Sequence, residues 1–319
     1  MKEILVSGST AFDTLMHYNG NFETLSQNGD ISSLLHMSII CESHEKFLGG
    51  TGLNIAYNLA LLGENPILLS AAGTDFVSDG VIDEGVNMKY FHKDRRYTTA
   101  GSIITSDNAE HKISIFYPGA MSMGDQTHVS YVTESLGISI VSANHIPAML
   151  NHAQELQAKN IPFFVDPAQQ ITAMSSIELQ DFLNLGTYLI ANEFEFQELQ
   201  NKSGYSDAEL GNMFEKIIIT QGSRGSELRE GETRTHIPAI PVDEVDDETG
   251  AGDAYRAGLL KGVIEGHDWQ TSCQIGTILA SYCIQVEGAQ NHHVSLGNIS
   301  EDMKTHFGKD IDLYIKRKY

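Results

Sequence analysis

A glycine-rich turn that runs into an apolar helix is the part of this chain best suited to chemistry. The segment reads Asp247-Glu-Thr-Gly250-Ala251-Gly252-Asp253 and continues as Ala-Tyr-Arg-Ala-Gly-Leu-Leu. Gly250 and Gly252 permit a tight backbone on which successive N–H groups converge, and a helix that begins at about Asp253 adds the positive end of its dipole. Such a turn can hold an anion, or a phosphoryl group that gains charge in its transition state.

Asp253 stands in that same turn, where a carboxylate beside an anion site costs free energy unless it has a use. The use that fits is to accept the proton of a hydroxyl group that attacks the phosphoryl group. A simple helix N-cap is the alternative interpretation, because Asp is a favoured capping residue. One turn further, Arg256 could reach a phosphate or form a salt bridge with the acidic run 243–248.

A second glycine cluster lies near the N-terminus and also precedes a helical pattern. It reads Gly49-Gly50-Thr-Gly52-Leu-Asn54-Ile-Ala56, and the helix after it closes at Gly63. Backbone donors and an amide side chain one turn into the helix suit the recognition of a substrate with several hydroxyl groups. A hinge or tight turn, with Asn54 as an ordinary helical residue, is the alternative.

The elements that must position these two turns follow an α/β pattern. Short apolar runs typical of buried parallel strands are bounded by Gly, Asp or Asn and alternate with helical stretches. This alternation predicts a doubly wound, mostly parallel sheet flanked by helices. The expected strands are 4–6, 66–70, 138–141, 162–165, 188–191 and 216–220, and the expected helices are 52–62, 148–159, 193–201, 253–265 and 269–286.

Two stretches, at about 14–47 and 87–116, do not follow this alternation of strands and helices. The first lacks a clear helix, and the second alternates like strands around an Asp107-Asn108 turn. Both are expected to supply strands of a small second sheet inserted into the main fold, so that residues 1–319 form a single domain.

Composition limits the function classes. The chain has 319 residues with 20 Lys plus Arg against 42 Asp plus Glu, a formal net charge of −22. This charge argues against nucleic acid and against an anionic membrane surface as partners. The three cysteines are far apart and odd in number, which predicts reduced thiols in a cytoplasmic protein, and no apolar run is long enough to span a membrane.

Five motifs in order make the chain resemble the ribokinase family, also called the PfkB carbohydrate kinase family, from end to end. Besides the two glycine segments, these are Asp166-Pro167 after a strand, Asn192-Glu-Phe-Glu195, and Thr220-Gln-Gly222-Ser-Arg-Gly225. The resemblance implies a ribokinase-like fold in which a small β-sheet forms a lid over the substrate.

The resemblance also implies a role for each matching residue. Asp253 would be the general base, and the N–H groups of Gly250, Ala251 and Gly252 would form the anion hole. Asn192 and Glu195 would organise Mg²⁺ through water. ATP, the co-substrate, would be bound by Asn192, Thr220, Gly222, Gly225, Gly288 and Gln290, and the substrate hydroxyls by Asp13, Gly49, Gly50 and Asn54. A monovalent cation near the turn is left open, because Glu248 stands where relatives often carry Pro or a small residue.

Within that family the chain looks most like bacterial and archaeal nucleoside kinases of the adenosine kinase kind. The segments that carry this likeness are 12–22, 115–121 and 287–292. The expected reaction is transfer of the γ-phosphoryl group of Mg·ATP to a nucleoside 5′-hydroxyl, with Phe116 against the base. The alternatives are a kinase for ribose or fructose, and a non-catalytic nucleoside- or nucleotide-binding protein of the same fold. The protein would be a monomer or a homodimer.

Overall fold

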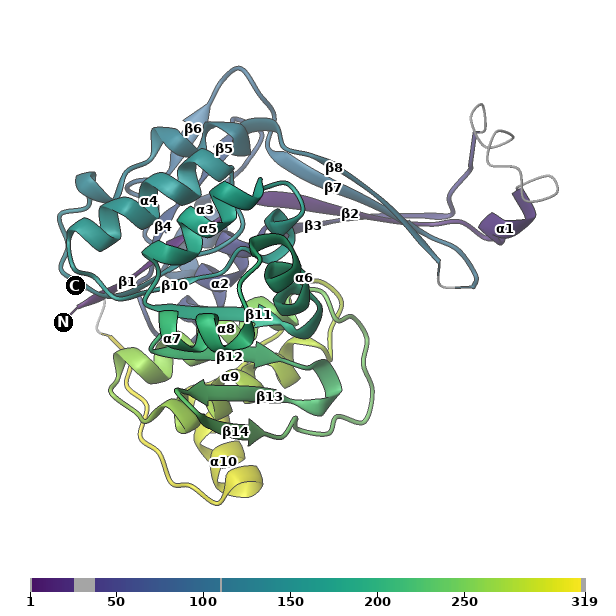
Figure 1. Ribbon diagram of the computed structural model, residues 1–319. Helices are drawn as coiled ribbons and strands as arrows, with labels where there is room; N and C mark the ends of the chain where they lie inside the picture. The colour runs from purple at the N-terminus through teal and green to yellow at the C-terminus, as the bar shows by residue number, and fades with distance from the viewer. Residues whose placement is uncertain (1, 26–37, 110, 317–319) are drawn as a thin grey trace.

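The computed structural model describes residues 2–25, 38–109 and 111–316, and an eight-stranded sheet forms the centre of the fold (Figure 1). The strand order is β14-β13-β12-β11-β10-β9-β1-β4; from β4 to β12 all neighbours are parallel, and β13 and β14 add an antiparallel hairpin at one edge. The strands are β1 Glu3–Ser7, β4 Ile67–Leu69, β9 Leu136–Val141, β10 Phe163–Val165, β11 Tyr188–Asn192, β12 Lys216–Thr220, β13 Ser226–Glu230 and β14 Thr233–Ile237.

Helices cover both faces of this sheet. One layer contains α2 Thr51–Leu61, α3 Asp79–Glu84, α8 Ala251–Ile264, α9 Trp269–Cys283 and α10 Leu296–Phe307. The other contains α4 Ile146–Ala158, α5 Ser176–Leu185, α6 Glu193–Ser203 and α7 Asp207–Met213. The described residues include no helix that is long and apolar enough to cross a membrane.

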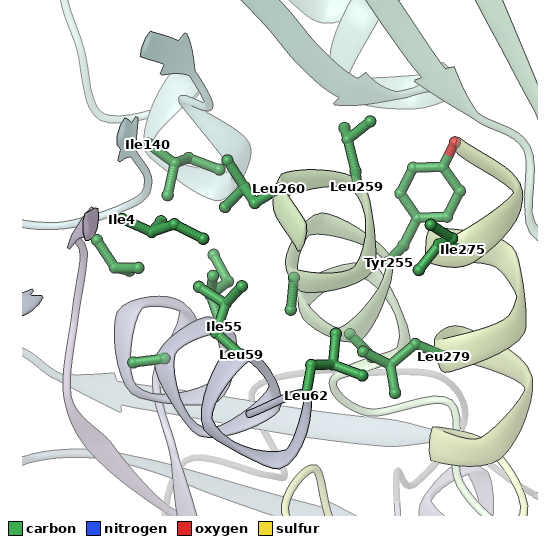
Figure 2. Close-up of a cluster of buried hydrophobic side chains, with 14 of the residues drawn as sticks. Ile4, Ile55, Leu59, Leu62, Ile140, Tyr255, Leu259, Leu260, Ile275 and Leu279 are labelled. Carbon is green, nitrogen blue, oxygen red and sulfur yellow. The ribbon is translucent and has the colours of Figure 1, made fainter. Parts of the chain in front are cut away.

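Alternating side chains of the strands fill two separate cores. In β1, Ile4 and Val6 pack into the core with α2, α8 and α9, whereas Leu5 faces the opposite core with α4, α5 and α6. Figure 2 shows part of the first core, in which Ile4 and Ile140 of the sheet meet Ile55 of α2 and Leu260 of α8. Continuous apolar strands are therefore required, because successive residues point to opposite, equally buried faces.

A separate four-stranded sheet projects from the body of the molecule (Figure 1). Its order is β3-β2-β7-β8, with bounds Ala11–His17 for β2, Ser43–Gly49 for β3, Ala100–Ser106 for β7 and Lys112–Tyr117 for β8. The short helix α1, Phe22–Leu25, lies near its far end, and β5 Ala71–Gly73 pairs with β6 His92–Asp94 in a two-stranded sheet.

The ribokinase-like α/β fold with a small additional sheet, as predicted from the sequence, is confirmed. Each of the six expected strands and five expected helices is present, with ends shifted by a few residues. The hairpin β13–β14 and the helices α3, α5, α7 and α10 lie outside the expected elements. Part of the first irregular stretch, 26–37, lies outside the described residues.

Glycines set the close approach of α8 to α9. A Cβ atom on Gly258 would lie 2.7 Å from the Cα atom of Gly276, and one on Gly276 would lie 2.6 Å from the carbonyl oxygen of Tyr255. Real Cβ atoms do not approach other atoms so closely, so the two helix backbones touch only because these residues have no side chain. This contact fixes the helix that begins at the Gly250–Gly252 turn.

Gly258→Ala is therefore expected to destabilise the protein by about 1–3 kcal/mol, since the added methyl group must push α8 and α9 apart. Chemical denaturation of the two proteins measures the difference. Gly211→Ala is the matched control: this glycine lies in α7 with open space around its Cα. The control should gain about 0.5–1 kcal/mol from helix propensity and reduced unfolded-state entropy. Equal effects of the two substitutions would contradict the packing described above.

Candidate active site

The residues singled out by the sequence gather at the carboxyl ends of the central parallel strands. Asp166 follows β10, while Asn192 and Thr220 are the paired last residues of β11 and β12. The first turns of α2 and α8, which carry the two glycine clusters, face each other across the same edge, because Asn54 hydrogen-bonds to Asp253. Ligand sites in open parallel sheets lie at this edge.

The turn before α8 has the conformation that its glycines allow. Gly250 is the N-cap residue with φ +82°, and a Cβ atom there would overlap Ala289. The N–H of Ala251 donates a long hydrogen bond of 3.2 Å to the carbonyl of Glu248. Because the first N–H groups of a helix have no intrahelical acceptor, the turn offers donors, with the helix dipole, to an anion.

Asp253 lies within the first turn of α8 and is only 8% exposed. Its Oδ2 accepts a hydrogen bond of 2.9 Å from Nδ2 of Asn54, whose Oδ1 in turn accepts one of 2.8 Å from Nε2 of Gln290. Burial, with the negative charges of Asp166 and Asp13, raises the pKa of Asp253 to about 6, against the opposing effects of Arg256 and Asn54. The carboxylate is thus ionised at neutral pH and close to its protonation range, as a general base requires.

Asp13 approaches this centre from strand β2 of the four-stranded sheet. Its carboxylate lies directly over Gly49, where any Cβ atom would overlap it, and the next residue, Gly50, has φ +92° against the carbonyl of Ser9. Burial and the nearby charge of Asp247 raise the pKa of Asp13 to about 6. Both glycines are therefore needed to bring the carboxylate and the start of α2 together.

Phe116 lies in the same cross-strand row as Asp13. Residues directly opposite each other on neighbouring strands point to the same face of a sheet, and this row consists of Phe47, Asp13, Ser102 and Phe116. Phe116 is 51% exposed. An aromatic ring thus stands free on the face that carries the Asp13 carboxylate.

Asn192 and Glu195 bind each other in a reciprocal helix cap at the start of α6. The Asn192 side chain accepts from the N–H of Glu195, and Glu195 accepts from the N–H of Asn192, each at 2.8 Å. Burial and the charge of Asp166 raise the pKa of Glu195, although Arg256 opposes this shift. The cap uses one oxygen of each side chain, so Glu195 keeps a second oxygen for water.

Direct metal ligands are scarce at this edge. In residues 2–25, 38–109 and 111–316 no group of three or more His, Cys, Asp or Glu side chains could hold a metal ion. A Mg²⁺ ion here would therefore need water and phosphate oxygens as ligands. The free oxygen of Glu195 would accept a hydrogen bond from one of those waters. This ligand set fits a magnesium ion, which retains water readily.

The two glycines of the predicted nucleotide loop, Gly222 and Gly225, differ in their surroundings. Gly222 has φ +57° with open space around it, whereas Gly225 has φ +94° and a Cβ atom there would overlap the carbonyl of Ile237 in β14. Gly225 is thus required by the fold of the hairpin.

Further along the chain, the Asp247 carboxylate accepts hydrogen bonds at both of its oxygens. The N–H of Gly288 donates one of 3.0 Å to Oδ2, and Thr249 donates to Oδ1.

Sequence reasoning missed the partner of Arg256. The expected alternative, a salt bridge with the acidic run 243–248, is wrong: the guanidinium Nη2 donates to Asp166 Oδ1 at 2.6 Å, and Asp166 Oδ2 accepts from Ser142 Oγ at 2.5 Å. The position of Asp166 at a strand end was visible in the sequence. Its distance from residue 256 in the chain hid the pairing.

The comparisons with known proteins agree with this architecture. The profile of the "pfkB family carbohydrate kinase" matches residues 29–295. A nucleoside kinase of Methanocaldococcus jannaschii is 27% identical over 313 residues, which cover 96% of this chain and 98% of the relative. A ribokinase of Lactococcus lactis is 27% identical over 83% of this chain and 88% of its own length.

Solved structures extend the similarity to three dimensions. The nucleoside kinase of Burkholderia thailandensis in complex with inosine superposes with a TM-score of 0.86 and 28% identity, covering 96% of this chain and 99% of that one. The same kinase in complex with ADP-inosine gives a TM-score of 0.84 over 99% of both chains. The chain belongs to the pfkB carbohydrate kinase family and is a phosphotransferase with an alcohol group as acceptor.

Proposed function

We propose that this protein is a nucleoside kinase that transfers the γ-phosphoryl group of Mg·ATP to the 5′-hydroxyl of a nucleoside. The observation that carries the proposal is the buried carboxylate of Asp253, held by Asn54 at the start of α8 and approached by Asp13 from the four-stranded sheet. The similarity to two nucleoside kinases over almost the whole chain supports the choice of acceptor.

In this mechanism Asp13 accepts hydrogen bonds from the ribose hydroxyls and Asn54 helps to orient the sugar. The 5′-hydroxyl then lies next to Asp253, which takes its proton as the oxygen attacks the γ-phosphorus in line. The N–H groups of the Gly250–Gly252 turn hold the negative charge that develops on the phosphoryl oxygens. Mg²⁺, when bound near Asn192 and Glu195, would neutralise part of the phosphate charge.

The nucleotide and the base occupy opposite sides of this centre. We assign four residues to the ATP side: Thr220 and Gly222 at and after the end of β12, and Gly288 and Gln290 in the segment that follows α9. Phe116 is assigned to the base, because its ring is free on the Asp13 face, and stacking on an aromatic ring contributes about 1–3 kcal/mol. The four-stranded sheet would then act as a lid that excludes water during transfer.

A kinase for a free sugar is the second candidate, supported by the likeness to a ribokinase. A coupled assay of ADP release with adenosine, inosine, guanosine, cytidine, ribose and fructose separates the two. Turnover of nucleosides supports the proposal. Turnover restricted to a sugar would support the mechanism of phosphoryl transfer but refute a nucleoside as the acceptor. No turnover with any acceptor would favour a binding protein.

Asp253→Asn is expected to lower kcat by about 10²–10⁴-fold, the usual contribution of a general base, while nucleoside binding changes little. The fold should become more stable at neutral pH. Because burial raises the pKa of Asp253 in the folded protein, ionisation of this carboxylate destabilises the fold. The stability that the protonated form retains is lost as the pH rises through about 6, and Asn, which does not ionise, avoids this loss. Thermal melting and steady-state kinetics measure the two effects. Unchanged kcat would rule out Asp253 as the base.

The pH dependence of kcat/KM for the nucleoside should have an acid limb with its midpoint near 6. Asp253 and Asp13 both have pKa values raised to about 6, and both must be ionised, so activity falls as pH drops through that value. With Mg·ATP saturating, the limb should approach a slope of two. Asp13→Asn should reduce the slope to one, and a flat profile down to pH 5 would be incompatible with both assignments.

Phe116→Ala tests the base slot. Loss of one stacking partner should raise the KM for a nucleoside about 5- to 100-fold with a smaller change in kcat. Ile115→Ala is the matched control, because the adjacent residue points to the other face of the same strand and is also exposed. Similar KM values for Phe116→Ala and the wild type would remove Phe116 from the site.

A further inference from the structure

The guanidinium of Arg256 is buried against the turn that would hold the transferred phosphoryl group. Arg256 lies one turn into α8 and is 7% exposed. A Cβ atom on Gly252 would be 2.7 Å from its Nη1, so the second glycine of the turn is the residue that makes room for this side chain. Nη1 is also 3.9 Å from Asp253 Oδ1, on the side of the carboxylate opposite Asn54's hydrogen bond to Oδ2.

We propose that Arg256 is a positioning residue for phosphoryl transfer: it ties the turn of α8 to the end of β10 and places a fixed positive charge behind the anion-binding N–H groups. This inference deepens the proposed function and depends on transfer taking place at this turn. Arg256 would act through the turn and through Asp253, without contact to either substrate.

The charges around Asp253 support this role. Of the charged groups that act on it, Asp13 from β2 and Asp166 after β10 are negative, and Arg256 from α8 is positive. Burial alone would lower the pKa of the guanidinium, but Asp166, Asp253 and Glu195 outweigh it and keep Arg256 charged. Arg256 is thus the positively charged side chain that offsets the negative charges of Asp166 and Asp13 at Asp253.

A purely structural salt bridge explains less of the geometry. Asp166 already accepts a hydrogen bond from Ser142, and Arg256 uses only Nη2 to reach it. The buried Nε of Arg256 has no hydrogen-bond partner among the described residues. Buried ion pairs that serve stability alone can often be replaced by neutral side chains without loss. An ion pair that supports the chemical step cannot be replaced in this way without loss of activity.

The decisive experiment replaces the whole pair. Arg256→Met alone would leave Asp166 buried without a counter-charge, so the test variant is Arg256→Met with Asp166→Asn. The control is Lys261→Met with Glu64→Gln, which removes two members of a buried charge cluster at the far end of the same helix. There Lys261 is fully buried, with its Nζ 2.9 Å from Glu64 and 2.8 Å from Glu265, and Glu64 also pairs with Lys316. Thermal melting shows whether each double variant is folded.

The proposal predicts that the Arg256/Asp166 variant loses about 100-fold or more in kcat, similar to the loss of one preorganised charge-stabilising donor, while KM values change less than about threefold. The Lys261/Glu64 control should retain its kcat whatever its stability. A kcat within about fivefold of the wild type in the folded Arg256/Asp166 variant would overturn the proposal, because the pair would then be structural.

A binding measurement keeps the inference separate from the choice of acceptor. Wild-type protein with Mg·ADP should gain further thermal stability on addition of fluoroaluminate, an analogue of the transferred phosphoryl group. The Arg256/Asp166 variant should lose most of that gain, and equal gains in the two proteins, including none in either, would contradict the role of Arg256. Inactivity of the wild type toward every nucleoside would refute the proposed function. The fluoroaluminate measurement would still decide the role of Arg256, because it does not depend on which acceptor is phosphorylated.

Arg256→Lys covers the case in which the double variant does not fold. This substitution keeps a positive charge for Asp166 but removes the planar group that lies against Gly252. It should lower kcat about 10-fold or more with little change in KM, and wild-type kcat in this variant would argue against the inference.

Discussion

The buried carboxylate of Asp253 is the constraint on which much of the structure depends. A negative charge in the first turn of a helix, almost wholly removed from water, must be balanced by fixed partners. The structure supplies the amide of Asn54 from α2, itself held by Gln290, and the guanidinium of Arg256. These partners come from segments up to about 200 residues away, and they can meet only because glycines at 49, 50, 250 and 252 let the chain pass closely.

Local charge placement also reconciles the acidity of the chain with an anionic substrate. With a net charge of −22, the overall field repels a triphosphate. In the proposed mechanism the positive potential comes from groups inside the site: the dipole of α8, the N–H groups of its first turn, and Arg256 behind them. The acidic residues before the turn are partly engaged as well, since Asp247 accepts hydrogen bonds from Thr249 and Gly288 that hold its pKa down in spite of burial.

The sequence predicted the central sheet and its helices because buried parallel strands and amphipathic helices leave strong periodic patterns. It also predicted that Asp253 and Asn54 lie at the starts of helices, because both follow glycine-rich turns. It did not predict the Arg256–Asp166 pair, which joins residues 90 positions apart and has no local signal. The row that puts Phe116 on the same face as Asp13, two strands away across Ser102, depends on strand register across β2, β7 and β8, and register is set by the packed sheet.

The identity of the phosphorylated oxygen tests the central claim most directly. Protein, Mg·ATP and inosine would be incubated together, and the product examined by phosphorus NMR with proton coupling. If Asp13 holds the ribose hydroxyls while Asp253 takes the proton, the product is the nucleoside 5′-monophosphate, with its phosphorus coupled to the two 5′ protons. Phosphate on the 2′- or 3′-oxygen, or phosphorylation of free ribose but not of the nucleoside, would contradict this arrangement of the site.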